Sequence, residues 1–195
     1  MEGHHERAPK ETRAGDDQDR FSDLYAAHYR DVIRFAARRI DADQARDVAA
    51  ETFLIAWRRF TEVPGDPAER LPWLYGVARN VLANQRRGER RRLRLGAQIG
   101  SAGRGRSEAD PAGEVAASLD VRAALDGLSP RDREVLQLVA WEGLEIAAAA
   151  AVVGCSPKTF AVRLHRARRR LEKALADHGA GARGRQSIEM KEARS

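Results

Sequence analysis

The chain has 195 residues, of which 43% are hydrophobic and 33% charged, with a formal net charge of +6. This length allows one or two small domains, and the positive charge favours a polyanionic partner, with nucleic acid ahead of a membrane surface. No run approaches the roughly 20 apolar residues of a membrane span, and the N-terminus has no apolar signal core. We therefore expect a cytoplasmic protein without membrane insertion.

The first predicted domain spans residues 20–95 and follows a polar tail, residues 1–19, that we expect to be disordered. From Phe21 onward apolar residues recur at helical spacing, which predicts two successive helices with one buried side each. The inward residues are Leu24, Val32, Phe35 and Ala36 in the first helix and Ala49, Phe53, Ala56 and Phe60 in the second. Residues 61–70 contain two prolines and a glycine, which predicts a loop.

A third helix is predicted to restart at Pro72 and to carry a basic, amide-bearing sector beside its core stripe. The stripe consists of Leu74, Val77, Ala78, Val81 and Leu82, and the exposed sector of Asn80, Asn84, Arg87 and Arg91, extended by Arg79, Arg86 and Arg90. Amides flanked by arginines combine hydrogen bonding to bases with neutralisation of phosphates. The plainer interpretation is a basic helix end that serves only solubility.

Residues 96–118 are rich in Gly, Ser, Ala and charge and show no sustained apolar period, which predicts a flexible linker. It separates the first domain from a second one at residues 119–177. Residues 178–195 return to a linker-like composition and are predicted to form a disordered tail. The expected fold is thus all-α, with two small helical domains on a tether.

The second domain carries the pattern of a helix-turn-helix. Ser129 and Pro130 open one capped helix, an alanine-rich helix covers residues 144–153, and Gly154 is placed to end it in a left-handed conformation. Ser156 and Pro157 then start a basic helix, because Ser caps free N–H groups and Pro fits the first position. Helix, turn and helix in this order predict a DNA-binding module.

The basic helix has two distinct sides. Its predicted buried stripe is Phe160, Leu164, Ala167 and Leu171. The opposite arc holds Lys158, Thr159, Val162, His165, Arg166 and Arg169. A helix in a DNA major groove must present such an arc to phosphates and base edges.

No pattern of catalytic residues is present in the sequence. It has no Walker-type glycine loop, no HExxH and no spaced Cys/His set, and His4 and His5 are adjacent without a spaced partner. The single cysteine, Cys155, cannot form an internal disulfide and is interpreted as a small filler of the predicted turn. We therefore expect neither an enzyme nor a metal or cofactor site.

Four segments together resemble an extracytoplasmic-function (ECF) sigma factor of the bacterial sigma-70 family, over about Phe21 to Leu175. They are FSDLYAAHYRDVIRFAARR, DVAAETFLIAWRRF, LPWLYGVARNVLANQRR, and LSPRDREVLQLVAWEGLEIAAAAAVVGCSPKTFAVRLHRARRRL. The resemblance implies that residues 20–95 are sigma domain 2 and residues 119–177 sigma domain 4. Such a protein directs core RNA polymerase to specific promoters and assists promoter melting, without catalysis of its own.

The resemblance also implies roles for individual residues. Candidate contacts with core polymerase, at its largest-subunit clamp, are Asp47, Glu51 and Thr52, while Ala50 stands where the family often has glutamine. Candidates for the −10 element are Asn80, Asn84, Arg86 and Arg87. Candidates for the −35 element are Lys158, Thr159, Val162, Arg163 and Arg166, although Ala161 and Val162 replace a lysine and a serine common in relatives.

Partners implied by the resemblance are the clamp and flap regions of core RNA polymerase, promoter DNA and an anti-sigma protein.

Trp57 and Trp73 are expected in the core by their helical register. Two alternatives remain open from the sequence: a stand-alone helix-turn-helix regulator, which leaves the segment from Asp47 to Arg87 unexplained, and a nucleic-acid enzyme, which lacks residues for the chemistry.

Overall fold

The computed structural model describes residues 10–97, 121 and 123–192, and all regular elements in this part of the chain are helical. The chain forms two compact units, residues 1–109 and 110–195. The described part of the chain therefore confirms the expected all-α class with two domains. The predicted linker, residues 96–118, lies almost entirely outside the described residues.

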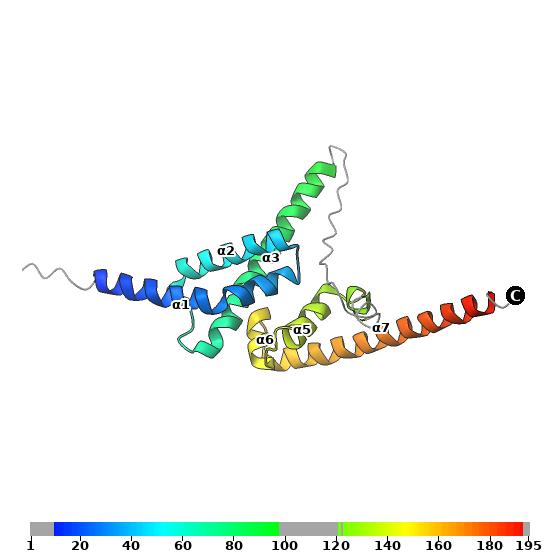
Figure 1. Ribbon diagram of the computed structural model, residues 1–195. Coiled ribbons are helices and arrows are strands. Elements are labelled where there is room, and N and C mark those ends of the chain that lie inside the picture. Colours follow the sequence, from blue (N-terminus) through cyan, green and yellow to red (C-terminus); the bar gives the residue numbers. More distant parts are fainter. Residues whose placement is uncertain (1–9, 98–120, 122, 193–195) are drawn as a thin grey trace, which may run out of the picture. The chain divides into compact units, whose positions relative to one another are not determined.

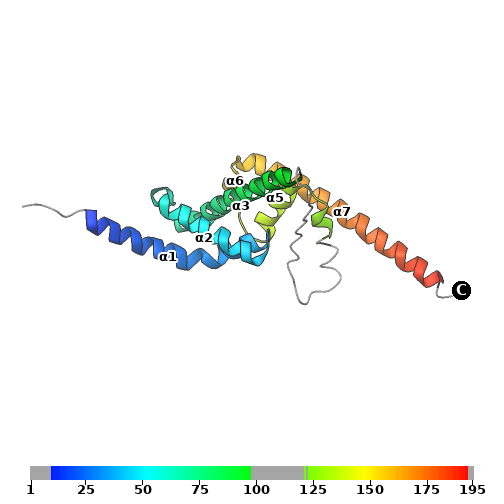
Figure 2. The same cartoon turned by 90° about the horizontal axis from the view of Figure 1, so that it is seen from above.

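The first unit consists of α1 (Lys10–Ala37), α2 (Ala42–Arg58), the short 3₁₀ helix η1 (Phe60–Glu62) and α3 (Pro67–Ala97). Helices α1 and α2 lie side by side, and α3 packs against both (Figures 1 and 2). Asp41 caps α2, because its side chain accepts a hydrogen bond from the N–H of Gln44 at 2.8 Å. This cap makes the reversal between α1 and α2 short and well defined.

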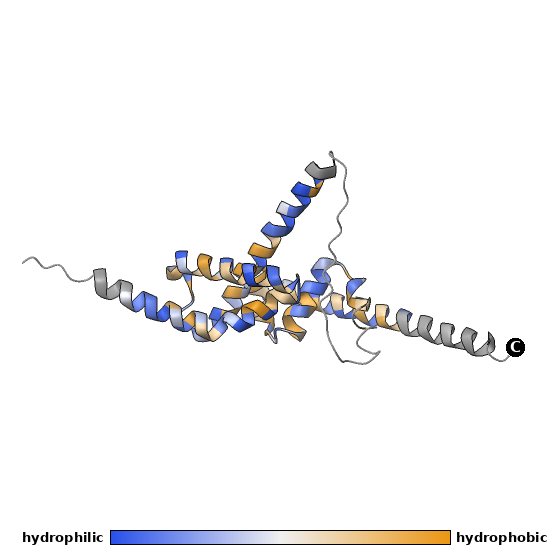
Figure 3. Ribbon diagram, turned by 45° about the horizontal axis from the view of Figure 1, so that its top comes forward, coloured by the Kyte–Doolittle hydropathy of each residue, from blue (hydrophilic) through white to orange (hydrophobic). Residues whose placement is uncertain are grey.

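The predicted apolar sides form the core of this unit. Phe35 of α1 stacks on Tyr75 of α3, with ring centroids 4.5 Å apart, so that the two helices are joined by an aromatic pair. The other predicted inward residues are buried, except that Phe60 is half-buried. In Figure 3 the apolar colour gathers where α1, α2 and α3 face one another. Burial of these faces is the main force that holds the three helices together.

Two boundaries in the first unit differ from the sequence prediction. Helix α1 begins at Lys10, well before Phe21, and its first turns contain oppositely charged neighbours such as Asp17 and Arg20, 3.5 Å apart. Helix α3 begins at Pro67, so Pro72 lies inside the helix and does not start it. The reason is a local cap: the carboxylate of Asp66 accepts a hydrogen bond from the N–H of Ala68 at 2.9 Å.

The second unit contains α5 (Pro130–Ala140), α6 (Ile146–Val153) and α7 (Pro157–Glu192), each of which contacts the other two. Ser129 caps α5 as predicted, and Gly154 ends α6 with φ 71° and ψ 45°. The alanine-rich helix begins at Ile146, two positions after the expected start. Helix α7 continues to Glu192, past Asp177, since an established helix gains one hydrogen bond for each residue added.

Candidate nucleic-acid interface

The exposed side of α7 is set by the cap at its first turn. The Ser156 hydroxyl oxygen accepts a hydrogen bond from the N–H of Thr159 at 3.2 Å, and Pro157 is the first helical residue. Phe160, Leu164 and Ala167 are buried, as the stripe predicted, while its fourth residue, Leu171, is half-buried. All five residues predicted to face the −35 element are exposed on the other side: Lys158, Thr159, Val162, Arg163 and Arg166. The structure therefore brings these five candidates together on one helical surface.

The turn before α7 is fixed by backbone geometry. Gly154 has a positive φ of 71°, a conformation that glycine adopts without the steric cost of a side chain. The N–H of Cys155 donates to the carbonyl of Ala150 at 3.0 Å and closes the end of α6. Ala149 and Ala150 are buried, so their small side chains are in the interface between α6 and its neighbours. The direction of the basic helix is thus set by a short, rigid turn.

An ion pair that the sequence analysis missed ties α7 to α5. Arg170 donates to the carboxylate of Asp132 at 2.6 Å, and the Ser129 hydroxyl donates to the same oxygen at 2.8 Å. The N–H of Asp132 donates back to the Ser129 hydroxyl at 3.2 Å. The spacing Ser-x-x-Asp at a helix start is a recognisable capping signal, but its link to Arg170 depends on the tertiary fold.

The second candidate DNA surface lies on α3. Asn80, Asn84, Arg86 and Arg87 are all exposed, and Arg87 donates a hydrogen bond to the side-chain oxygen of Asn84. Arg86 reaches back to the turn that follows α1 and donates to the carbonyl of Arg39 at 3.4 Å. The amide of Asn84 is therefore oriented by its arginine neighbour, while the carbonyl contact directs Arg86 toward the end of α1.

The candidate polymerase-binding surface lies on α2, and one of its three residues is placed differently from the prediction. Asp47 and Glu51 are exposed and one helical turn apart. Thr52 was expected to be exposed as well, which is wrong: its exposed fraction is 0%, and its hydroxyl donates to the carbonyl of Val48 at 2.6 Å. Threonine can occupy an apolar interior because that bond satisfies its only polar group within its own helix.

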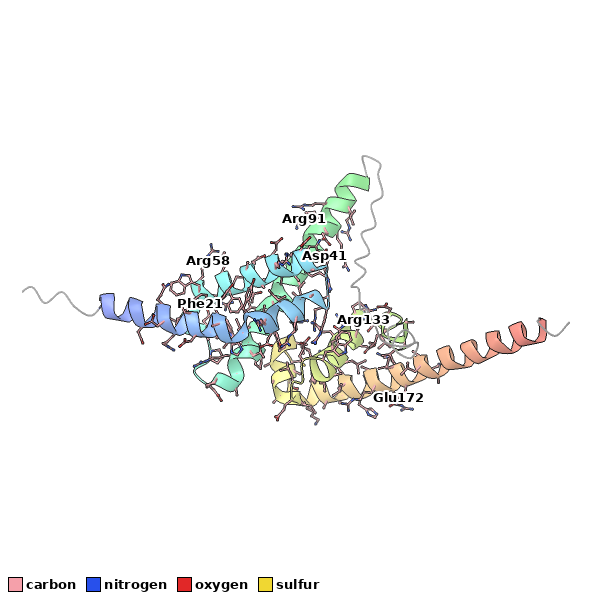
Figure 4. All side chains as sticks on the ribbon, viewed as in Figure 1. Phe21, Asp41, Arg58, Arg91, Arg133 and Glu172 are labelled. Carbon is pink, nitrogen blue, oxygen red and sulfur yellow. The ribbon has the colours of Figure 1, made fainter. Side chains whose placement is uncertain are left out.

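Leu54 was missed by the sequence analysis. It lies one turn beyond Glu51 on the same face of α2, with an exposed fraction of 47%. Arg58 follows one turn later and is also exposed (Figure 4). The helical spacing of Asp47, Glu51, Leu54 and Arg58 is a signal that could have identified the full row. Its chemistry is mixed, with two carboxylates, one large apolar side chain and one guanidinium.

Trp57 differs from its prediction too. Its exposed fraction is 41%, so it is not in the core, and its ring meets the edge of Phe21 with centroids 5.0 Å apart. Trp73 is half-buried. The side chain of Trp57 thus covers an aromatic cluster at the α1–α2 contact and keeps a large part of its own surface in solvent.

Comparison with known proteins shows the family to which the chain belongs. A family model described as Sigma-70 region 2 matches residues 24–92, and one described as Sigma-70, region 4 matches residues 118–171. The ECF RNA polymerase sigma factor SigL of Mycobacterium tuberculosis is 38% identical over 161 residues, which cover 80% of this chain and 89% of SigL. The chain is an ECF sigma factor.

Other relatives of this sigma factor give the same result. The ECF RNA polymerase sigma factor EcfG of Rhodopseudomonas palustris is 33% identical over 143 residues, which cover 72% of this chain and 76% of EcfG. The sigma factor RpoE of Bartonella quintana, solved in complex with the anti-sigma factor NepR, superposes with a TM-score of 0.62 at 26% identity. The superposition covers 80% of this chain and 96% of RpoE.

The sigma factor is a non-catalytic subunit of RNA polymerase that acts in transcription initiation, as the resemblance predicted. Sigma factors bind core RNA polymerase, and region 4 of this one contains the helix-turn-helix formed by α6 and α7. In the described ranges no group of three or more His, Cys, Asp or Glu side chains is placed to hold a metal ion. None of the helices described has the length and apolarity needed to cross a membrane.

Proposed function

We propose that the sigma factor divides promoter recognition and polymerase binding among three exposed surfaces. The observation that carries this proposal is the presence of an exposed basic face in each of the two units, one on α3 and one on α7. Two modest contacts joined by a tether bind more tightly than either alone, because the first raises the effective concentration of the second. The sigma factor would act in the cytoplasm, where it would direct RNA polymerase to chromosomal promoters.

The α2 face would bind the clamp of the largest polymerase subunit. Asp47 and Glu51 supply negative charge to pair with a basic surface, and charge complementarity of this kind guides orientation and association rate. Leu54 beside them offers an apolar side chain for the centre of the contact. Thr52 contributes indirectly, because it is buried and packs this helix against its own unit. A second polymerase contact, between the flap region and the second unit, is part of the same proposal.

The α3 face would hold the −10 element. Asn80 and Asn84 offer amides that both donate to and accept from base edges, and Arg86 and Arg87 neutralise phosphates. Exposing a base costs a few kcal/mol of unstacking, which capture of the base and strand must offset. The hydrogen bond between Arg87 and Asn84 supports this role, since it fixes the amide before DNA arrives.

The α7 face would read the −35 element from the major groove. Lys158, Arg163 and Arg166 supply positive charge, Thr159 a hydroxyl, and Val162 an apolar surface suited to a thymine methyl group. Val162 has an exposed fraction of 46%. Its apolar side chain is therefore accessible to a thymine methyl group, and a contact with that group would remove apolar surface from water. The rigid turn at Gly154 supports the proposal by fixing how the helix leaves the second unit.

An anti-sigma protein is proposed as a regulatory partner. RpoE of Bartonella quintana is bound to the anti-sigma factor NepR in its crystal, and its chain is covered to 96% by the superposition. A comparable inhibitor of this sigma factor would hide one or more of the three surfaces. Co-purification of the tagged chain from its own cells, followed by in vitro transcription with and without the captured protein, tests this directly.

A gel shift with and without core polymerase tests the main proposal. We expect the full chain alone to bind promoter duplex weakly, and the holoenzyme to bind it tightly and selectively. The matched control is the same duplex with the −10 and −35 bases exchanged for others. If the chain alone bound the promoter duplex as tightly and as selectively as the holoenzyme does, the proposed division of roles among the three surfaces would be overturned. The polymerase-binding surface would then be unnecessary for promoter recognition.

A further inference from the structure

The exposed face of α2 carries a row of one apolar and three charged side chains. The members of this α2 row follow one another at intervals of four, three and four residues: Asp47, Glu51, Leu54 and Arg58. At about 100° per residue, all four fall within roughly 30° of one direction, and Figure 4 shows Arg58 pointing away from α1. Among the described residues, Asp47, Glu51 and Arg58 take part in no ion pair or side-chain hydrogen bond. The row therefore presents two negative charges and one positive charge to a partner from outside the unit.

The order of side chains along the α2 row is self-complementary. Its midpoint is the peptide bond between residues 52 and 53, and Asp47 and Arg58 lie equally far from this point on its two sides. Glu51 and Leu54 form a second such pair nearer to the midpoint. A twofold axis at this level, perpendicular to α2, sets a second copy of the helix antiparallel to the first, with each residue opposite its counterpart. Asp47 of each copy then faces Arg58 of the other, which gives two pairs of opposite charge.

The spacing of the row also suits contact between two helices. Intervals of four and three residues are those of the a and d positions along which paired helices pack. Leu54 is the large apolar side chain of the row, with an exposed fraction of 47%. In the antiparallel arrangement it lies against the methylene groups of Glu51 of the second copy. Contact there removes apolar surface from water, which favours association.

A large and a small side chain lie together on one flank of the row. Trp57 has an exposed fraction of 41%, and Ala50, which is also exposed, falls on the same side of α2. The twofold axis places this flank beside the same flank of the second copy. Trp57 of each copy then lies about two residues, or roughly 3 Å, along the helix from the level of Ala50 of the other. An indole ring spans that offset, and the alanine leaves space for it that a glutamine, frequent at this position in the family, would fill.

We propose that the exposed face of α2 also binds a second copy of this sigma factor, in an antiparallel dimer with twofold symmetry. The match of charge and of side-chain size between the two halves of the row favours a second copy over an unrelated partner. The contact runs along about 16 Å of one helix and covers less than the roughly 800 Å² per partner of a stable complex, so the dimer is weak and transient. A chain in the dimer cannot bind polymerase through the same face. This masking rests on the proposed function of the α2 face, whereas the dimer itself does not.

The first test exchanges charges at the two ends of the row. Sedimentation equilibrium of the full chain, from about 5 to 500 μM at low ionic strength, measures the dissociation constant of the dimer. Asp47→Arg and Arg58→Asp should each weaken the dimer at least tenfold, because each puts like charges opposite one another at both ends. An equimolar mixture of the two variants should form a heterodimer with an affinity near that of the parent, since every end pair is then of opposite charge. A mixture that binds no more tightly than either variant alone, or a parent chain that stays monomeric, would overturn the dimer.

Matched control variants separate the α2 face from general changes in charge and size. Asp23→Arg makes the same charge reversal at an exposed site of α1 and should leave the dissociation constant of the dimer unchanged. Ala50→Gln should weaken the dimer about fivefold or more by filling the space for Trp57. Ala42→Gln, at another exposed position of α2, should not. Thermal unfolding of each variant verifies that it is folded, and equal losses from a variant and its control would overturn the proposed contact.

The fluorescence of Trp57 reports the contact from the side of the indole ring. Because the exposed ring loses water when the dimer forms, its emission maximum should shift to shorter wavelength as the chain is concentrated. Trp73→Phe and Trp141→Phe should retain this shift, and Trp57→Phe should lose it. A shift that survives Trp57→Phe, or no shift in a parent chain that dimerises, would contradict the placement of Trp57 in the contact.

Addition of core polymerase tests the masking of the α2 face. Sedimentation velocity should show that the dimer dissociates as core enzyme is added, because a partner that binds only the monomer shifts the equilibrium by mass action. The resulting complex should contain one chain per core enzyme, and a complex with two chains would overturn the masking. The proposed polymerase contact is judged separately. Unchanged binding of core enzyme by Asp47→Arg would contradict that contact, while the heterodimer experiment, which contains no polymerase, decides the dimer.

Discussion

The carboxylate of Asp132, at the start of α5, lies 2.6 Å from the guanidinium of Arg170, which is on the helix that carries the proposed −35 face. Asp132 is nearly buried, with 12% of its side chain exposed, whereas 60% of Arg170 is exposed. The pair joins two elements of the helix-turn-helix unit that are 38 residues apart in the chain. It fixes where the basic helix lies on its support.

Removing one partner of this pair should destabilise the second unit. Because Arg170 is mostly exposed and its charge screened by water, Arg170→Ala should cost no more than about 1 kcal/mol. Asp132→Ala also removes a bond to the Ser129 cap and should cost about 1–2 kcal/mol. Urea unfolding of the single and double variants gives the coupling energy. Glu172→Ala, an exposed change on the same helix, is the control. The pairing would be contradicted if the double variant lost as much unfolding free energy as the two single variants together.

Asp47→Arg should weaken association with core polymerase, since it reverses the charge on the α2 face. The expected loss is at least tenfold in affinity, because in the proposed contact the new positive charge would face a basic surface of the polymerase. Fluorescence titration of labelled chain with core enzyme measures it. Asp23→Arg makes the same change at an exposed site of α1 and should have little effect. Equal affinities for the two variants would remove Asp47 from the polymerase contact.

Arg166→Ala should weaken binding to the −35 element and leave core association intact. Removing an arginine that binds a base is expected to cost about 1–3 kcal/mol and to relax selection at one position of the element. Footprinting of holoenzyme on a set of single-base −35 variants reports both effects. Arg168→Ala removes an exposed arginine from another side of α7 and serves as control. Unaltered occupancy and selectivity would exclude Arg166 from the reading face.

Thr52→Val should retain polymerase binding, because the side chain is buried and reaches no partner. The substitution removes the hydroxyl bond to the Val48 carbonyl, and a hydrogen bond of this kind contributes about 0.5–1.5 kcal/mol net, so the stability change should stay below about 1.5 kcal/mol. Thr52→Arg should unfold the first unit. Weaker core binding by a fully folded Thr52→Val protein would show that the side chain takes part in the contact.

His28 should make the stability of the first unit depend on pH. Burial lowers the pKa of its imidazole from the ordinary value of 6.5, and the charge of Arg70 lowers this pKa further while Asp31 opposes the shift. The unfolded chain then binds more protons than the folded one below about pH 6.5, so stability is full above that pH and falls as the solution is acidified. Urea unfolding of the parent and His28→Gln from pH 7.5 to 5 measures this; identical slopes would contradict it.

Local signals in the sequence predicted much of the fold because the responsible contacts are short-range. Ser129, Gly154 and Ser156 act within three or four residues of their own position, and the structure places each as its type requires. The apolar stripes were predictable for the same reason, since helical periodicity decides which side is buried. Asp66 and Pro67 carry an equally local signal, but it was interpreted as part of a loop.

Several of the residues that were misplaced or missed depend on contacts between helices, which no local pattern records. Thr52 was expected outside because the resemblance implied it as a polymerase contact, yet its hydroxyl bonds within its own helix and allows burial. Trp57 lies at the edge of the apolar sector, where the position of Phe21 on another helix leaves part of the ring in solvent. The pairing of Asp132 with Arg170 requires knowledge of how α7 crosses α5.

In vitro transcription from a library of genomic promoter fragments, with start sites mapped, tests the central claim most directly. We expect core polymerase with the full chain to start at a limited set of sites that share two spaced sequence elements. The Asn80 and Arg166 variants should each relax selection at one of the two elements. Starts without any shared element, or relaxation of the same element by both variants, would contradict the assignment of the two basic faces.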